Sequence, residues 1–206
     1  MKTFTKTLIA TALLTTGAAA QADVSGSVGV ATSYLFRGFD LSAGSAAVSG
    51  SLDYTEGGFY AGIWGSSGDD TYGTEYDLYA GFAGEVGGLG YDVGYIDYNY
   101  PTIEGAADFE EWYVGLSYDA FGLYAYDGID ADYTYINLSA SLGDFTLAYG
   151  DFISGDDFDG SHIDLTYAIG DLGFTFSQGS GDSYEAAAFS PEELQFVVSY
   201  SLPVEL

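Results

Sequence analysis

The sequence has no cysteine, few basic residues and no long apolar run. It contains no cysteine, so it has no disulfides, which a closed β-barrel does not need because closure pairs every strand edge. It has 3 Lys and Arg against 31 Asp and Glu, which excludes a nucleic-acid partner, since such proteins need a basic face. No apolar run reaches the roughly 18 residues of a transmembrane helix. A helical membrane protein is therefore excluded.

The acidity itself is extreme, with a formal net charge of −28. Disordered chains are often acidic, but they are poor in aromatic residues, whereas this chain has 20 Tyr and 14 Phe. We therefore expect a folded protein. Two explanations of the acidity stay open at this point. One is a saline habitat, where Asp and Glu keep protein surfaces hydrated, and the other is a functional role for the carboxylates.

The first 22 residues have the features of a secretory signal peptide. Lys2 and Lys6 form a positively charged start, an apolar run follows from Leu8 to Leu14, and Ala20-Gln21-Ala22 is a small-residue cleavage site. We expect cleavage after Ala22, which leaves residues 23–206 as the mature domain. Without its two lysines the formal charge falls from −28 to −30, and Arg37 is the only remaining Lys or Arg.

The rest of the chain alternates short turns with longer polar loops, which is typical of bacterial outer-membrane barrels. We predict an all-β fold, an antiparallel up-and-down transmembrane β-barrel of about twelve strands. Two of the segments are short, so ten strands is the alternative. The predicted strands span residues 24–37, 46–54, 59–66, 74–86, 89–99, 109–119, 122–128, 132–142, 145–152, 161–170, 172–178 and 193–202.

Within these strands, side chains alternate between an apolar and a polar face. In the segment 75–86, Leu78 and Phe82 share one face, while Glu75, Asp77 and Glu85 share the other. Periodicity alone does not say which face points inward. The Gly, Ala and Ser residues among the acids suit a crowded interior, and Tyr and Trp near strand ends suit a lipid interface. We therefore expect the apolar face to contact lipid.

Several stretches resemble one known family. They are residues 33–38, 47–54, 58–64, 75–81 and 91–95, including Ser33-Tyr34-Leu35-Phe36-Arg37-Gly38 and Gly58-Phe59-Tyr60-Ala61-Gly62-Ile63-Trp64. They resemble the TorF family of porins over about residues 24–118. The resemblance implies a small outer-membrane barrel that acts as a channel. The chain departs from the usual barrel end by adding Pro203 to Leu206 after the last predicted strand, so Tyr200 and Leu202 are expected to signal to the barrel-assembly machinery.

The expected pore lining contains one cation and several acids. Its candidates are Arg37, Asp53, Glu75, Asp77, Asp92, Glu111 and Asp164. Arg37, placed on the first strand, is expected to project into the lumen and to pair with Asp53, Glu75 or Asp77. It serves either as part of a rigidifying ion-pair network or as a constriction residue. Rings of acids favour cations, so an open pore is expected to be cation-selective.

Two further features carry less weight. The acidic loops at residues 127–132 and 155–160 bring carboxylates together, but neither matches a calcium-binding loop, and no metal or cofactor is predicted.

His162 is followed by Asp164, but a catalytic serine and an orienting group would have to come from another strand, and no nucleophile motif exists. The chain is therefore not expected to be an enzyme.

Together these features predict an outer-membrane porin for small cationic or neutral solutes, embedded in outer-membrane lipid. The main alternative is a plugged barrel that serves as an anchor or adhesion surface. A soluble acidic β-protein of the periplasm is a third possibility. Single-channel recording in a planar bilayer distinguishes the porin from the plugged barrel, because a plugged barrel gives no conductance steps. A heat-dependent change in the gel migration of the membrane fraction distinguishes both barrels from a soluble periplasmic protein.

Overall fold

The structure is a computed structural model that describes residues 22–68, 73–103, 109–129, 131–186 and 193–205. The expected signal peptide lies almost wholly outside these residues, so its cleavage stays a prediction. Among the described residues, no helix is long and apolar enough to cross a membrane.

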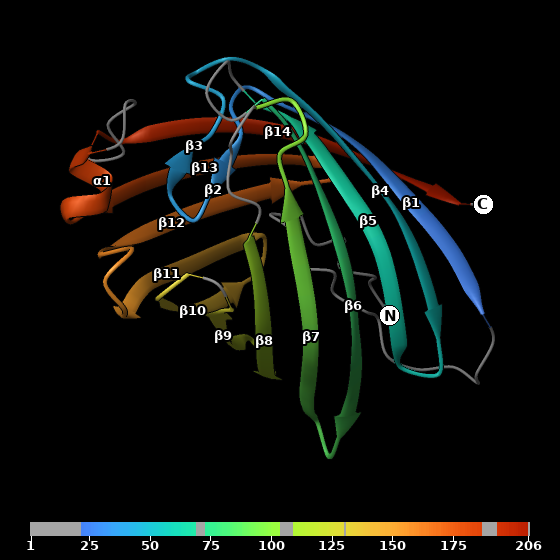
Figure 1. Cartoon of the computed structure of the whole chain (residues 1–206). Helices are drawn as coiled ribbons and strands as arrows, with labels where there is room; N and C mark the ends of the chain where they lie inside the picture. Colours follow the sequence, from blue (N-terminus) through green and yellow to red (C-terminus); the bar gives the residue numbers. More distant parts are fainter. Residues whose placement is uncertain (1–21, 69–72, 104–108, 130, 187–192, 206) are drawn as a thin grey trace.

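In the described residues, twelve antiparallel strands close into one barrel (Figure 1). Each strand pairs with its neighbours in sequence, and β1 closes the ring by pairing with both β4 and β14. The barrel strands are β1 (Asp23–Ala31), β4 (Ala47–Glu56), β5 (Phe59–Ser67), β6 (Thr74–Val86), β7 (Leu89–Asn99), β8 (Phe109–Tyr118), β9 (Phe121–Gly128), β10 (Thr134–Leu142), β11 (Phe145–Ser154), β12 (Gly160–Ile169), β13 (Leu172–Ser180) and β14 (Gln195–Glu205). The predicted fold class and the count of twelve strands are confirmed, and the alternative of ten is wrong.

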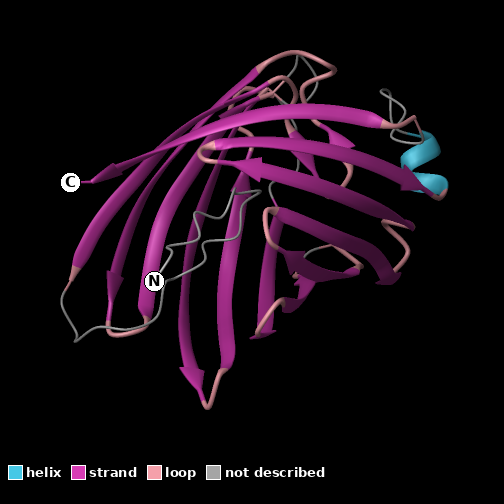
Figure 2. Ribbon diagram, turned by 180° about the vertical axis from the view of Figure 1, so that it is seen from behind, coloured by secondary structure: helices cyan, strands magenta, loops and turns pink. Residues whose placement is uncertain are grey.

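The two ends of the barrel differ as the sequence predicted. Short turns at residues 57–58, 87–88, 119–120, 143–144 and 170–171 join strands at the turn end. Longer connections, one of which carries the short helix α1 (Asp182–Ala186), lie at the loop end (Figure 2). At Gly87 and Gly143 the backbone has φ of 61°, a left-handed conformation that glycine adopts without strain.

The apolar face points outward. Leu78, Val93 and Val114 are each 45–51% exposed, whereas Glu75 and Asp77, on the other face of β6, are each 2% exposed. In a soluble barrel this distribution would be reversed, because water would solvate the acids on the outside. An outer surface of Val, Leu, Ile and Phe around a polar interior is that of a barrel immersed in lipid.

The last strand is longer than predicted. β14 continues through Pro203 to Glu205, and Pro203 pairs with Ser27 of β1. The pairing of β14 with β13 covers Gln195 to Tyr200 and ends at Tyr200, opposite Leu172. Pro203 therefore has a strand neighbour on one side only, where a missing N–H disrupts no second ladder. Residues 203–205 therefore belong to the barrel wall and are not an added tail.

The largest difference from prediction concerns the first strand. β1 ends at Ala31 and not at residue 37, and the chain then forms a separate hairpin of β2 (Leu35–Phe36) and β3 (Phe39–Asp40). Figure 1 shows this hairpin, hereafter the inner hairpin, hanging from the loop end within the ring of strands. Its turn residues Arg37 and Gly38 have φ of 49° and 81°. Positive φ at both central residues defines a two-residue turn that reverses the strand tightly.

Candidate functional site: the barrel lumen

The tip of the inner hairpin is buried in the lumen. Arg37 is 9% exposed, and Leu35 and Leu41 at the base of the hairpin are 7% and 5% exposed. A Cβ at Gly38 would lie 2.7 Å from the Cβ of His162 on β12, so only glycine fits this close approach. The left-handed conformation costs a non-glycine residue such as Arg37 about 1–2 kcal/mol, so contacts of its side chain must stabilise the turn.

Arg37 forms a two-fold ion pair with Glu111 of β8. Its Nη1 and Nη2 donate to Oε1 and Oε2 at 2.7 and 2.8 Å. The hydroxyls of Tyr133 and Tyr98 donate to the same two oxygens at 2.6 and 2.8 Å. Glu111 is fully buried, so four donors replace the water that its carboxylate has lost.

The predicted partners of Arg37 were wrong. Among the described residues Arg37 pairs with Glu111, and not with Asp53, Glu75 or Asp77. The error follows from placing Arg37 on the first strand, in the same part of the barrel wall as β4 and β6, which carry these three acids. Because the inner hairpin leaves the wall, its tip reaches strands on the far side of the barrel. The sequence had placed Glu111 in the lumen, but nothing in it paired Glu111 with Arg37.

Aromatic rings surround the guanidinium. Its carbon lies 4.3 Å from the ring centre of Tyr135, 4.7 Å from Tyr126 and 4.9 Å from Phe36. Each ring presents its electron-rich face to the cation, which stabilises a charge removed from water. Arg37 is the only Lys or Arg in the part of the chain that the structure describes, and it is held by both an acid and an aromatic cage.

The opposite side of the inner hairpin is also fixed. The Tyr184 hydroxyl of α1 donates to the Arg37 carbonyl at 2.7 Å, and Gln195 Nε2 of β14 donates to the Gly38 carbonyl at 2.8 Å. Phe39 stacks on Tyr184 with ring centres 4.3 Å apart. Burial raises the pKa of the Tyr184 hydroxyl far above its usual range, so it remains a donor at neutral pH.

These contacts place the hairpin across the lumen. Strands β8, which carries Glu111, and β14, which carries Gln195, are six places apart in the ring of twelve and therefore opposite each other. The inner hairpin thus bridges the barrel near its loop end and narrows the interior there.

Tyrosines fill part of the remaining lumen. Tyr60 and Tyr124 donate to the two oxygens of Asp92 at 2.6 and 3.3 Å. Tyr79 donates to Asp53, which also accepts from Ser51 Oγ at 2.8 Å. The rings lie over glycines: a Cβ at Gly62 would meet the Tyr79 ring, and one at Gly81 or Gly94 would meet the Tyr60 hydroxyl. Glycine on the wall therefore makes room for tyrosine in the interior.

The predicted acids share the lumen face but not one cluster. Asp53 and Asp92 bind tyrosines, Glu111 binds Arg37, and Asp164 contacts His162. Glu75 and Asp77 form a separate buried pair near the loop end of β6. Glu85, also expected in the lumen, is exposed at the turn end of the same strand.

His162 lies between two polar partners. Its Nδ1 is 3.2 Å from Asp164 Oδ1, and its Nε2 is 2.7 Å from the Tyr135 hydroxyl. We predicted that an orienting group for His162 would come from another strand, but Asp164 comes from the same strand, because residues two apart in a strand share a face. Both ring nitrogens are therefore engaged, by Tyr135 and Asp164 and not by a serine of the described residues.

Neither acidic loop forms a metal cage in the residues described. Asp157 Oδ2 accepts from the backbone N–H of Asp132 at 2.6 Å, which ties the two loops together, while Asp130 lies outside the described residues. The described residues hold no group of three or more His, Asp or Glu arranged for a metal ion.

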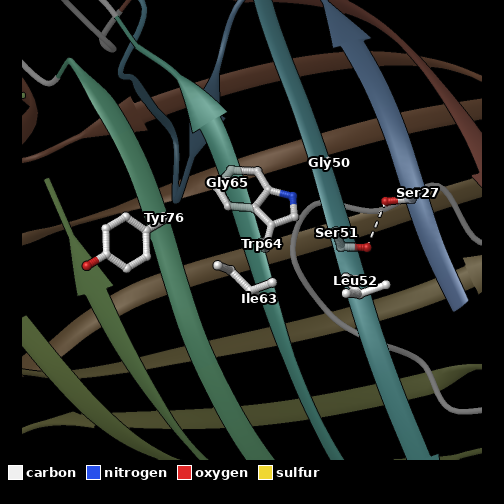
Figure 3. A pocket seen from close by; sticks show the side chains of 8 residues that line it. All are labelled: Ser27, Gly50, Ser51, Leu52, Ile63, Trp64, Gly65 and Tyr76. Carbon is white, nitrogen blue, oxygen red and sulfur yellow. Dashed lines mark hydrogen bonds between the residues drawn. The ribbon is translucent and has the colours of Figure 1, made fainter. Parts of the chain in front are cut away.

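A pocket of about 320 Å³ lies against β1, β4, β5 and β6 (Figure 3). Gly50 and Gly65 face each other there, so the wall lacks side chains at that point. The hydroxyls of Ser27 and Ser51 lie 2.9 Å apart and bond to each other. The lining is Ser27, Gly50, Ser51, Leu52, Ile63, Trp64, Gly65 and Tyr76. Its serine hydroxyls are already paired, so the pocket offers no evident catalytic group.

A closed twelve-stranded barrel, apolar outside and polar within, is an outer-membrane-type β-barrel. The chain belongs to the family described as bacterial protein of unknown function (Gcw_chp), whose model matches residues 15–197. Among solved structures it is similar to outer membrane phospholipase A from Escherichia coli, with 14% sequence identity and a TM-score of 0.45 over 91% of this chain and 98% of that one. A comparison with curated proteins finds no match.

Proposed function

We propose that the protein is an outer-membrane channel for small cationic or neutral solutes, as its resemblance to the TorF porins implies. The observation that carries the proposal is the charge balance of the interior. Arg37 is already compensated by Glu111, while Asp53, Glu75, Asp77, Asp92 and Asp164 also lie on the lumen face. Such an interior attracts cations and repels anions.

The composition of the barrel wall on the side away from the lumen tyrosines supports a path for solutes. The lumen face of β11 to β14 and of β1 carries small side chains toward the turn end. They are Thr146, Ala148, Thr166, Ala168, Gly173, Thr175, Ser199, Ser201, Ser27 and Gly29. Small polar groups leave room for water, so we place the path along this wall, with the inner hairpin as its constriction.

Planar-bilayer recording tests the proposal. The mature barrel, residues 23–206, is reconstituted under a KCl gradient, and the reversal potential is measured. We expect small steps and a potential that indicates preference for potassium. Steps with chloride preference would overturn the cationic selectivity, and the absence of steps in protein shown to be folded would overturn the channel itself.

The second candidate is a non-conducting barrel that acts as an anchor or adhesion surface. The bridge from Glu111 through the inner hairpin to Gln195 favours it, because a fixed plug blocks passage. A hydrolase is less well supported, since both nitrogens of His162 are engaged by Asp164 and Tyr135.

Location and biogenesis have their own tests. We propose export by a cleaved signal peptide, insertion by the barrel-assembly machinery and residence in outer-membrane lipid. The mass of the purified protein is expected to match a chain that begins at Asp23. The membrane fraction is expected to migrate faster on a gel when unheated. A chain that stays dissolved without detergent would contradict this location.

A further inference from the structure

The carboxylates of Glu75 and Asp77 differ from the other acids of the lumen. They lie two residues apart on β6, on the same face, and each residue is 2% exposed. Both oxygens of Glu75 and Oδ1 of Asp77 have no hydrogen-bond partner of ordinary geometry within the described residues. By contrast, Asp53, Asp92 and Glu111 each accept at least two hydrogen bonds.

Oxygen-bearing side chains lie around this pair, and none of the described residues places a Lys or Arg side chain beside it. The hydroxyls of Tyr34 and Tyr100 and the carboxyl group of Asp77 lie next to the Glu75 carboxyl group, but not in hydrogen bonds of ordinary geometry. Ser66 of β5 is the direct strand partner of Glu75, and Ser66 is itself buried. Arg37, the one Lys or Arg of the described residues, is engaged by Glu111.

The negative charges of two neighbouring carboxylates that are removed from water must be neutralised or stabilised by other groups. An uncompensated buried charge is strongly unfavourable, and two of the same sign repel each other. The remaining ways to compensate them are a shared proton or a bound cation. Three unpaired carboxylate oxygens beside two phenol hydroxyls form a set of hard oxygen donors, which suits calcium or magnesium.

We propose that Glu75 and Asp77 bind a hard divalent cation of the calcium class. With two carboxylates rather than three, the coordination is completed by the hydroxyls of Tyr34 and Tyr100 and by water. Tyr34 immediately precedes β2, and Tyr100 immediately follows β7. The cation would therefore tie the base of the inner hairpin to the barrel wall at the loop end. The inference goes beyond the channel, because a plugged barrel would hold the same ion.

Terbium luminescence offers a direct test, because Tb³⁺ replaces calcium at oxygen sites and is sensitised by a nearby indole. Trp64 is the strand partner of Asp77, and its ring centre lies 5.5 Å from that of Tyr34. The mature barrel in detergent is titrated with Tb³⁺ under tryptophan excitation, and then with Ca²⁺ as competitor. We expect a saturable signal that calcium displaces.

Matched variants separate this site from the other acids of the chain. Glu75→Gln and Asp77→Asn are expected to lose the calcium-displaceable signal, and Glu85→Gln, an exposed acid on the same strand, is expected to keep it. Trp64→Phe should lower the emission more than Trp112→Phe, since Trp112 lies on the outer face. Gel migration of unheated samples checks that each variant folds.

Two outcomes would overturn the proposal. One is the same calcium-displaceable signal in folded Glu75→Gln and Asp77→Asn as in the unaltered protein. The other is no saturable signal at all, which would leave a shared proton as the compensating charge. Neither outcome bears on conductance, so failure of the cation site is distinguishable from failure of the channel.

Discussion

Arg37 and Glu111, 74 residues apart in sequence, meet through two parallel hydrogen bonds of 2.7 and 2.8 Å inside the barrel. This ion pair joins the tip of the inner hairpin to the wall at β8. It positions a segment that the sequence had placed in the wall, and so it determines how much of the lumen is open.

Removing one member of the ion pair should destabilise the fold. Arg37→Ala leaves the carboxylate of Glu111 buried without a cation, and a lost partner of this kind costs about 3–5 kcal/mol. The measurement is urea unfolding of the barrel in lipid vesicles. The double variant Arg37→Met, Glu111→Leu should lose less unfolding free energy than Arg37→Ala alone, because it leaves no unpaired charge. Equal stability of Arg37→Ala and the unaltered barrel would contradict the role of the pair.

Removing the inner hairpin should open the lumen. Replacing residues 35–40 with a short Gly-Ser linker takes away the bridge between β8 and β14. We expect single-channel conductance to rise severalfold if the hairpin is the constriction. Replacing loop residues 156–159 in the same way serves as the control, because this loop carries no residue that binds the hairpin. Unchanged conductance on removal of the hairpin would place the constriction elsewhere, at the tyrosines beside Asp92.

Neutralising lumen acids should weaken cation preference. Asp92→Asn removes one negative charge while keeping an oxygen that accepts from Tyr60. The reversal potential in a KCl gradient is expected to move toward zero, and more at low salt, because ions screen charges over about 10 Å at 0.1 M. Glu56→Gln, exposed near a turn, is the control and should change selectivity less.

A charge on the outer face should oppose insertion. Val93 lies mid-strand on β7, is 48% exposed, and pairs with Phe82 and Val114. Val93→Arg would place a cation against acyl chains, at a cost of about 2–4 kcal/mol near the bilayer centre. Ser139→Arg puts the same charge on the lumen face of β10 as a control. Unfolding in vesicles compares the two, and a larger loss for Ser139→Arg would contradict the assigned orientation.

Much of the fold was readable from residue order. Leu78 and Glu75 take opposite faces because strand side chains alternate, and Gly87-Gly88 and Gly143-Asp144 mark turns because glycine tolerates positive φ. The lumen placement of Asp53, Asp92 and Glu111 followed from the same alternation. The inner hairpin was missed because Leu35-Phe36 continues the alternation of the first strand, which was therefore predicted to run to residue 37. The dipeptide Arg37-Gly38 was the local signal of a tight turn.

The all-β barrel, its inverted faces and its acidic interior could be predicted from the amino-acid sequence, since each depends on local alternation and composition. Only the folded barrel shows that Arg37 meets Glu111, that Tyr135 and Asp164 hold His162, and that buried oxygens of Glu75 and Asp77 have no hydrogen-bond partner among the described residues. The physical reason is the sequence separation over which each feature is determined. Alternation is fixed by neighbours two residues apart, whereas contacts across the lumen depend on ring closure and on a connection that folds inward.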